Sequence, residues 1–135
     1  MLDKSKKNIL LTNYVNTFYK DVDYLDIHFG TKKLQKQCSS LEECTKKWGS
    51  ECAKLIMRRL DDALASNNLQ VLKSVHRRCH ALTGDREGQW SLDVKHPFRL
   101  IFVPANDPIP KKQDGSLLLE YITVIKILEV IDTHG

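Results

Sequence analysis

The order of hydrophobic and polar residues along the chain changes near residue 78. Before this point, apolar residues recur at steps of three and four, a spacing typical of amphipathic helices. After it, short apolar runs rich in branched and aromatic residues alternate with turn sequences, which is typical of strands. Helices followed by successive strands predict an α+β fold with a short N-terminal strand, two or three helices and then an antiparallel sheet.

The first half predicts one strand and its helices. YLDIHF, residues 24–29, alternates as a strand does and ends at a glycine. The stretch TKKLQKQC that follows predicts a short helix capped by Thr31. Ser39 or Ser40 then caps a long helix whose apolar stripe continues to Leu64, with Gly49 as its only weak point. LQVLKSV adds one more helical turn.

Four segments of the second half are expected to be strands: CHAL, GQWSLDV, PFRLIFVP and LLLEYITVIKILEV. Between the last two lies ANDPIPKKQDGS, residues 105–116, which is too rich in Pro, Lys and Gly for a strand. We expect it to form a long hairpin loop. At the other end of the chain, residues 1–23 carry only a loose helical pattern, which fits either a helix or an arm.

Length and composition narrow the class of protein. At 135 residues the chain is long enough for one domain with one core. Its formal net charge of +4 permits a phosphate-rich partner without requiring one. No stretch has the character of a signal peptide or a membrane span, so we expect a cytoplasmic protein with no membrane partner. The four cysteines form no CxxC pair and are expected to be reduced, buried structural thiols.

Histidines and cations gather in the second half. Cutting RNA without a metal requires a base for the ribose 2′-hydroxyl, an acid for the leaving 5′ oxygen and cations around the phosphate. Histidine suits both proton roles near neutral pH. Three of the five histidines lie in or beside the expected sheet: His80, His96 and His134. Between residues 73 and 99 six cations face three acids, and the cations are Lys73, Arg77, Arg78, Arg86, Lys95 and Arg99.

Each of these residues also has a structural interpretation. A single histidine at a strand end is more often structural than catalytic, and we expect His28 and His96 to be structural. An arginine in a strand often simply points outward beside a buried apolar residue. The basic residues of the long helix, among them Lys46 and Arg59, are expected to form a solvated face.

Other chemistries find less support. The chain has no phosphate-binding glycine loop, no HExxH pair and no nucleophile elbow around a serine. A Cys–His hydrolase could use Cys79 and His80, but neighbours on a strand point to opposite faces and cannot easily share a proton. We expect neither a metal nor a cofactor.

The sequence HALTGDREGQWSLDV, followed by FRLIF and by the ending ILEVIDTHG, resembles the HigB branch of the RelE/ParE toxin superfamily, the plasmid-maintenance killer proteins. The resemblance covers residues 24–135 and leaves residues 1–23 as an N-terminal extension, either an added arm or an upstream start. It implies a toxin of a bacterial toxin–antitoxin pair, namely an endoribonuclease that cleaves messenger RNA in the ribosome. It also implies a HigA-like antitoxin with a helix-turn-helix domain as partner.

The same resemblance implies site residues. The catalytic ones are His80, Arg99, Asp132 and His134, with Arg99 beside the scissile phosphate. The surrounding cations, Lys73, Arg77, Arg78, Arg86 and Lys95, are expected to bind RNA.

Two features of the motif leave alternatives open. The turn from Gly84 to Gly88 is expected to close a hairpin that presents His80 on the concave face of the sheet above a buried Trp90, with Arg86 either as turn structure or as a phosphate contact. The family's tyrosine between Asp and His is replaced by Thr133, which cannot stack on a base. Two other functions therefore stay open: a ParE-type gyrase inhibitor whose histidines do no chemistry, and a decayed toxin that still binds its antitoxin.

Overall fold

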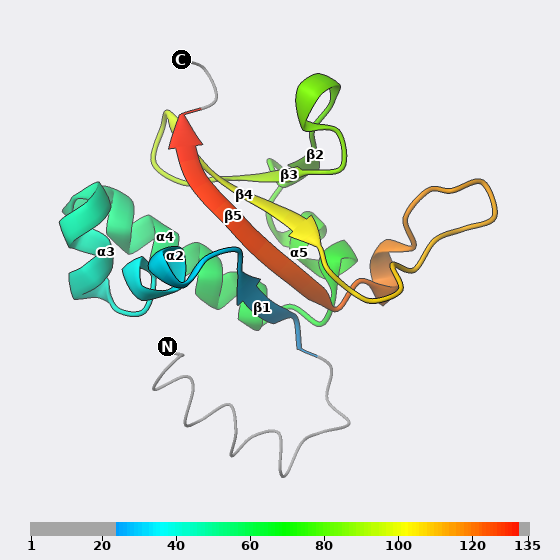
Figure 1. Ribbon diagram of the computed structural model, residues 1–135, viewed down its shortest axis with the longest axis horizontal. Coiled ribbons are helices and arrows are strands. Elements are labelled where there is room, and N and C mark those ends of the chain that lie inside the picture. Colours follow the sequence, from blue (N-terminus) through cyan, green and yellow to red (C-terminus); the bar gives the residue numbers. More distant parts are fainter. Residues whose placement is uncertain (1–23, 133–135) are drawn as a thin grey trace, which may run out of the picture.

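A computed structural model describes residues 24–132 of the chain, which form a five-stranded sheet with helices packed against it (Figure 1). The strands are β1 (Asp26–Phe29), β2 (His80–Ala81), β3 (Trp90–Asp93), β4 (Phe98–Pro104) and β5 (Val124–Asp132). The helices are α2 (Lys32–Gln37), α3 (Leu41–Trp48), α4 (Ser50–Leu64) and α5 (Leu69–Val75). Short 3₁₀ turns occupy Gly84–Arg86 and Leu119–Tyr121. The predicted α+β class is confirmed.

The helices begin where the polar residues predicted, but the long helix is divided. Thr31 Oγ1 accepts a hydrogen bond from the Leu34 N–H, and Ser40 Oγ accepts one from the Glu43 N–H. The single helix expected up to Leu64 is wrong, because Gly49 adopts a φ of 85° that ends α3 and starts α4. This part of the chain therefore has four helices rather than two or three.

The sheet is mixed rather than purely antiparallel. Its strand order is β1-β5-β4-β3-β2, and β2 to β5 pair antiparallel as expected. The first strand joins the same sheet by pairing parallel to β5, with Asp26 opposite Val124. Parallel neighbours require a long crossover, and here everything between residues 30 and 123 forms it. The purely antiparallel prediction is wrong at this one edge.

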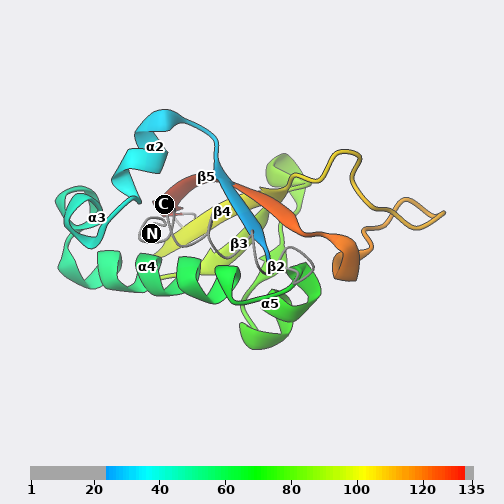
Figure 2. The same ribbon diagram turned by 90° about the horizontal axis from the view of Figure 1, so that it is seen from below.

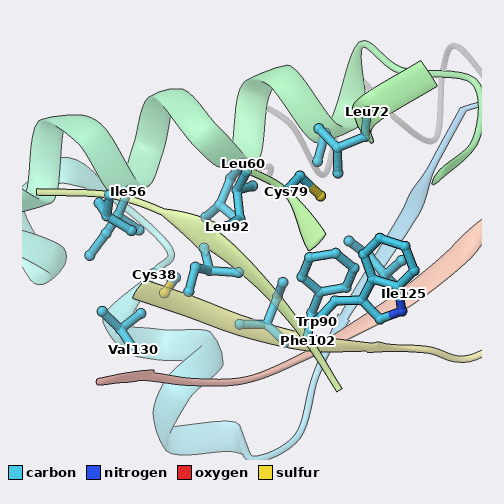
Figure 3. Packing of buried hydrophobic residues seen from close by; sticks show 14 of the residues in the cluster. Cys38, Ile56, Leu60, Leu72, Cys79, Trp90, Leu92, Phe102, Ile125 and Val130 are labelled. Atoms are coloured by element: carbon cyan, nitrogen blue, oxygen red, sulfur yellow. The ribbon is translucent and has the colours of Figure 1, made fainter. Parts of the chain in front are cut away.

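One apolar core lies between the sheet and α4, which runs across one face of the strands (Figure 2). Trp90 and Phe102 stack near its centre with ring centroids 6.2 Å apart (Figure 3). The cysteines belong to this core, and all of them are buried free thiols: Cys38, Cys44, Cys52 and Cys79. The expectation of structural thiols is therefore confirmed in the described residues.

The connection from β4 to β5 is longer than the sequence pattern suggested. LLLEYITVIKILEV was expected to be one strand, but its first part forms the 3₁₀ turn Leu119–Tyr121, and β5 begins only at Val124. The side chain of Asn106 explains this start, because its Oδ1 accepts hydrogen bonds from the N–H groups of Thr123 and Val124, each at 3.0 Å. The side chain of Asn106 thus binds the backbone N–H groups that a longer strand would have used to pair with its neighbour.

Between residues 24 and 132, no helix combines the length and apolar character needed to cross a membrane. The helix or arm predicted for residues 1–23 lies outside the described residues.

Candidate functional site

Charged side chains collect on the face of the sheet opposite α4. The strand register places Asp93, Arg99 and Ile131 side by side, whereas the next row is Leu92, Leu100 and Val130. Because side chains alternate along strands, the first row faces away from the core and the second faces into it. We call the outward set the charged face: His80, Ser91, Asp93, Arg99, Ile101, Glu129 and Ile131, together with the Arg78 and Arg86 side chains that bind to it.

Asp93 holds two arginines on the charged face. Its Oδ1 lies 3.0 Å from Nη1 of Arg99, and its Oδ2 accepts a hydrogen bond from Nε of Arg78. The Arg99 side chain is only 12% exposed, whereas that of Arg78 is 68% exposed. One carboxylate therefore fixes a nearly buried guanidinium in a strand and draws an exposed one toward it.

A second ion pair crosses the charged face from the hairpin turn. Nη1 of Arg86 donates to Oε1 of Gln89 at 2.7 Å and to Oε2 of Glu129 at 3.0 Å. Glu129 is the register partner of Ile101, a fully buried residue that does not belong to the core cluster beneath α4. Arg86 thus ties the turn to β5, as the turn-structure interpretation requires, and its guanidinium still faces the charged face.

His80 is an exposed imidazole with one nitrogen already assigned. Its Nδ1 lies 3.1 Å from the carbonyl oxygen of Ala81. A carbonyl can only accept, so Nδ1 carries the hydrogen and the neutral ring keeps a lone pair on Nε2. No other described residue occupies Nε2. Nε2 is therefore the ring nitrogen that stays open to a ligand on this face.

The hairpin places His80 on the same face as Arg99, as predicted. His80 pairs with Ser91, which in turn pairs with Ile101, two residues from Arg99 on β4. Standard spacings put the two backbones roughly 10 Å apart across the strands and about 7 Å along them. Ser91 between them is fully buried, and its Oγ has no hydrogen-bond partner among the described residues.

The last residue of β5, Asp132, does not share the charged face. Asp132 pairs with Phe98, so the strand alternation directs it to the face opposite Arg99. The described strand therefore brings His80 and Arg99 together, but it does not bring Asp132 with them. His134 and Thr133 lie outside the described residues.

The remaining predicted RNA-binding cations lie outside the charged face and bind none of its carboxylates. Lys73 lies in the last turn of α5, and Arg77 lies in the exposed turn before β2. Lys95 lies in the β3–β4 turn, where its Nζ is 3.6 Å from Oε1 of Glu51. His28, expected to be structural, lies on the edge strand β1 with Nε2 3.3 Å from Oδ2 of Asp26.

Three residues that shape the charged face were not predicted from the sequence: Arg59, Asp93 and Glu129. Arg59, expected on a solvated helix face, is half-buried and donates from Nε to the Asp93 carbonyl at 2.8 Å. Asp93 and Glu129 were not predicted as site residues. A signal was present, because WSLD and FRLI flank a short turn that places Asp93 opposite Arg99 in a hairpin.

Burial removes the cysteine next to His80 from the candidate chemistry. The Cys79 side chain points into the core (Figure 3), where burial raises the pKa of its thiol to about 12. A thiol with this pKa is protonated at neutral pH and is a poor nucleophile. The two neighbours face opposite sides, as the strand alternation predicted.

Within residues 24–132, no three His, Cys, Asp or Glu side chains are placed to hold a metal ion together. Comparison with family models, with curated proteins and with solved structures found no match.

Proposed function

We propose that the chain is a ribosome-dependent mRNA endoribonuclease, the toxin of a type II toxin–antitoxin pair, similar to the HigB branch of the RelE/ParE superfamily. One observation carries the proposal: a histidine with an available Nε2 shares a sheet face with arginines held in place by carboxylates. These are the groups that metal-free RNA cleavage needs.

In this proposal, Nε2 of His80 takes the proton of the ribose 2′-hydroxyl, and that oxygen attacks the adjacent phosphorus. Arg99 and Arg78 lie beside the phosphate and stabilise the negative charge that develops on its oxygens. Because Asp93 already orients both guanidinium groups, little reorganisation is needed when the charge appears.

The leaving 5′ oxygen needs a proton, which we assign to His134 alone, because Asp132 faces the side of the sheet opposite Arg99. The ribosome would hold the message in position, because a small domain with a net charge of +4 binds phosphate weakly. The site of action is then the cytoplasm, and the partner that silences the toxin is a HigA-like antitoxin with a helix-turn-helix domain.

The test is cleavage of an mRNA on purified ribosomes, with the RNA ends mapped. His80→Ala should lower cleavage by a factor of about 10² to 10⁴, the usual contribution of a general base. His28→Ala is the matched control, because His28 is exposed on the far edge strand, and it should leave cleavage unchanged.

The other functions predict different results. Growth arrest with intact messages and broken DNA would support a ParE-type gyrase inhibitor. Antitoxin binding without toxicity would indicate a decayed toxin. Rapid cutting of free RNA at physiological salt without ribosomes would contradict the proposed mode of action.

A further inference from the structure

A hollow of about 310 Å³ opens where the α3–α4 junction meets the β3–β4 turn. This volume lies at the lower end of the range for small-molecule sites. Its walls include the aromatic side chains of Trp48 and Phe98, and Glu51, Lys95 and His96 lie among its other lining residues. The hollow is separate from the charged face, because Phe98 pairs with Asp132 and faces away from Arg99.

The sequence builds this hollow through one backbone feature. Gly49 has a φ of 85°, a conformation that other residues rarely adopt, and it turns the chain between α3 and α4. The turn leaves Trp48 as the last residue of α3 and brings Glu51 into the first turn of α4. Trp48 packs partly against the core, so one wall of the hollow is fixed.

The hollow combines aromatic side chains with a pair of opposite charges. Trp48 and Phe98 are both only half-buried, so each keeps aromatic surface that a ligand in the hollow can contact. The Lys95 ammonium and the Glu51 carboxylate lie 3.6 Å apart, with side chains 48% and 80% exposed, so a donor and an acceptor stand next to each other and remain open to a ligand. A flat ring with a polar edge that alternates donor and acceptor satisfies both. A nucleobase is such a ring.

We infer that this hollow binds an unstacked guanine base of the RNA, and this inference rests on the proposed function. The guanine ring stacks on Trp48 or Phe98. Glu51 accepts hydrogen bonds from guanine N1–H and N2–H with its two carboxylate oxygens, and Lys95 donates to guanine O6. Adenine offers a single donor at that edge, and pyrimidines stack with less area, so guanine fits best.

The position of the hollow connects it with the proposed chemistry. Phe98 in its wall directly precedes Arg99 in β4, and both lie at the end of the strand next to the β3–β4 turn. An RNA strand that passes around this end can present a phosphate to Arg99 and a neighbouring base to the hollow. The hollow would then select sequence, while the charged face would cut.

Tryptophan fluorescence tests this inference without any cleavage. The chain has two tryptophans, and Trp90 is only 4% exposed in the core. Titration of the full chain with guanosine 5′-monophosphate should quench the emission of Trp48, with weaker quenching by the adenosine, cytidine and uridine monophosphates. The Trp48→Phe variant keeps an aromatic wall and should lose the quenching, which also controls for absorption by the nucleotide.

Two further variants test the edge contacts. Glu51→Gln should weaken guanosine monophosphate binding at least about tenfold, because it removes the negative charge and replaces one of the two accepting oxygens by an N–H₂ donor. Glu42→Gln, an exposed acid at the start of α3 outside the hollow, should bind as the unchanged chain does. Circular dichroism on each variant confirms that it is folded.

Each other outcome would overturn the inference. These outcomes are absence of quenching, equal quenching by ribose 5-phosphate, and equal affinities for the Glu51→Gln and Glu42→Gln chains. Because binding is measured on mononucleotides, it can fail while cleavage succeeds, and it can succeed in a chain that cuts nothing. The two proposals therefore fail separately.

Discussion

The two faces of the sheet are built from the same three strands and have opposite contents. On the face under α4, the row Leu92, Leu100 and Val130 is buried in one apolar cluster. One residue further along, the row becomes Asp93, Arg99 and Ile131. A period of two in the sequence is therefore enough to put the apolar core on one face of the sheet and the paired charges on the other.

The charged face also differs from an ordinary solvated surface. Three arginines, Arg78, Arg86 and Arg99, bind two carboxylates, those of Asp93 and Glu129, so this set carries a surplus of one positive charge. Arg99 is nearly buried, and burying a charge is costly unless it is paired. This face therefore holds its cations in fixed positions, which is what a phosphate-binding surface requires.

The largest expected effect is on the apolar face. Phe102→Ala removes a fully buried ring that stacks on Trp90, and it should lower the free energy of unfolding by about 3–5 kcal/mol. Val103→Ala, the next residue on the opposite face and only half-buried, should cost clearly less. Urea denaturation measures both values. Equal losses would show that the two faces do not divide the stability as described.

The second expected effect is on the charged face and concerns rate rather than stability. Arg99→Ala should lower ribosome-dependent cleavage about a hundredfold, because it removes a cation that acts mainly on the transition state. Arg58→Ala, an exposed arginine on α4, should leave cleavage unchanged. If the two variants cut equally well and Arg99→Ala is folded, the charged face is not the active face.

The pattern of residues was enough to predict most elements of this fold. The Thr31 and Ser40 caps, the hairpin around residues 84–88 and the strand PFRLIFVP all follow from local signals, and the structure has them. The division at Gly49 did not follow, because an apolar stripe continues across it. The parallel pairing of β1 with β5 joins segments almost a hundred residues apart, so no local signal could reveal it.

Local sequence patterns also predicted part of the candidate site. His80 and Arg99 were found as residue types in strands, and the register confirms that they share a face. Apart from Asp93, which the hairpin places opposite Arg99, the partners on this face could not be found that way. Glu129 meets Arg86 across three strands, and Arg59 reaches Asp93 from a helix, so both contacts depend on tertiary packing.

The third prediction contrasts two neighbours, the buried Cys79 and the exposed His80. Burial raises the pKa of the Cys79 thiol from about 9 to about 12, so the folded chain binds this proton more tightly than the unfolded chain does. The resulting stability is fully present below pH 9 and is lost progressively as the pH rises to about 12. The loss should be about 1 kcal/mol between pH 9 and pH 10, because the unfolded thiol is only half deprotonated at pH 9.

Urea denaturation of the unchanged chain and of Cys79→Ala at pH 8, 9 and 10 measures this contribution. The variant lacks the titrating thiol. Between pH 9 and pH 10 its free energy of unfolding should therefore fall less than that of the unchanged chain, and the difference is the contribution of Cys79. Comparing slopes separates the titration from the packing cost of the substitution, which is the same at each pH. Parallel pH curves for the two chains would contradict the assignment to Cys79.

The smallest expected effect concerns the rim of the charged face, where Arg86 meets Glu129. The two side chains are 34% and 41% exposed, so the ion pair should contribute only about 0.2–1 kcal/mol, and less in high salt. Glu129→Gln should therefore change the stability slightly while releasing the charge of Arg86. If RNA binds this face, its affinity should rise, and the slope of log affinity against log salt should steepen by about 0.7.

The Glu120→Gln variant is the control for this last prediction, because Glu120 is an exposed acid in the 3₁₀ turn Leu119–Tyr121, outside the charged face. Both variants add the same net charge to the chain. A general electrostatic effect would change RNA binding equally in the two, whereas a phosphate contact by Arg86 changes it only in Glu129→Gln. Weaker RNA binding by Glu129→Gln would mean that the ion pair itself shapes the RNA surface and that Arg86 acts through the turn it holds.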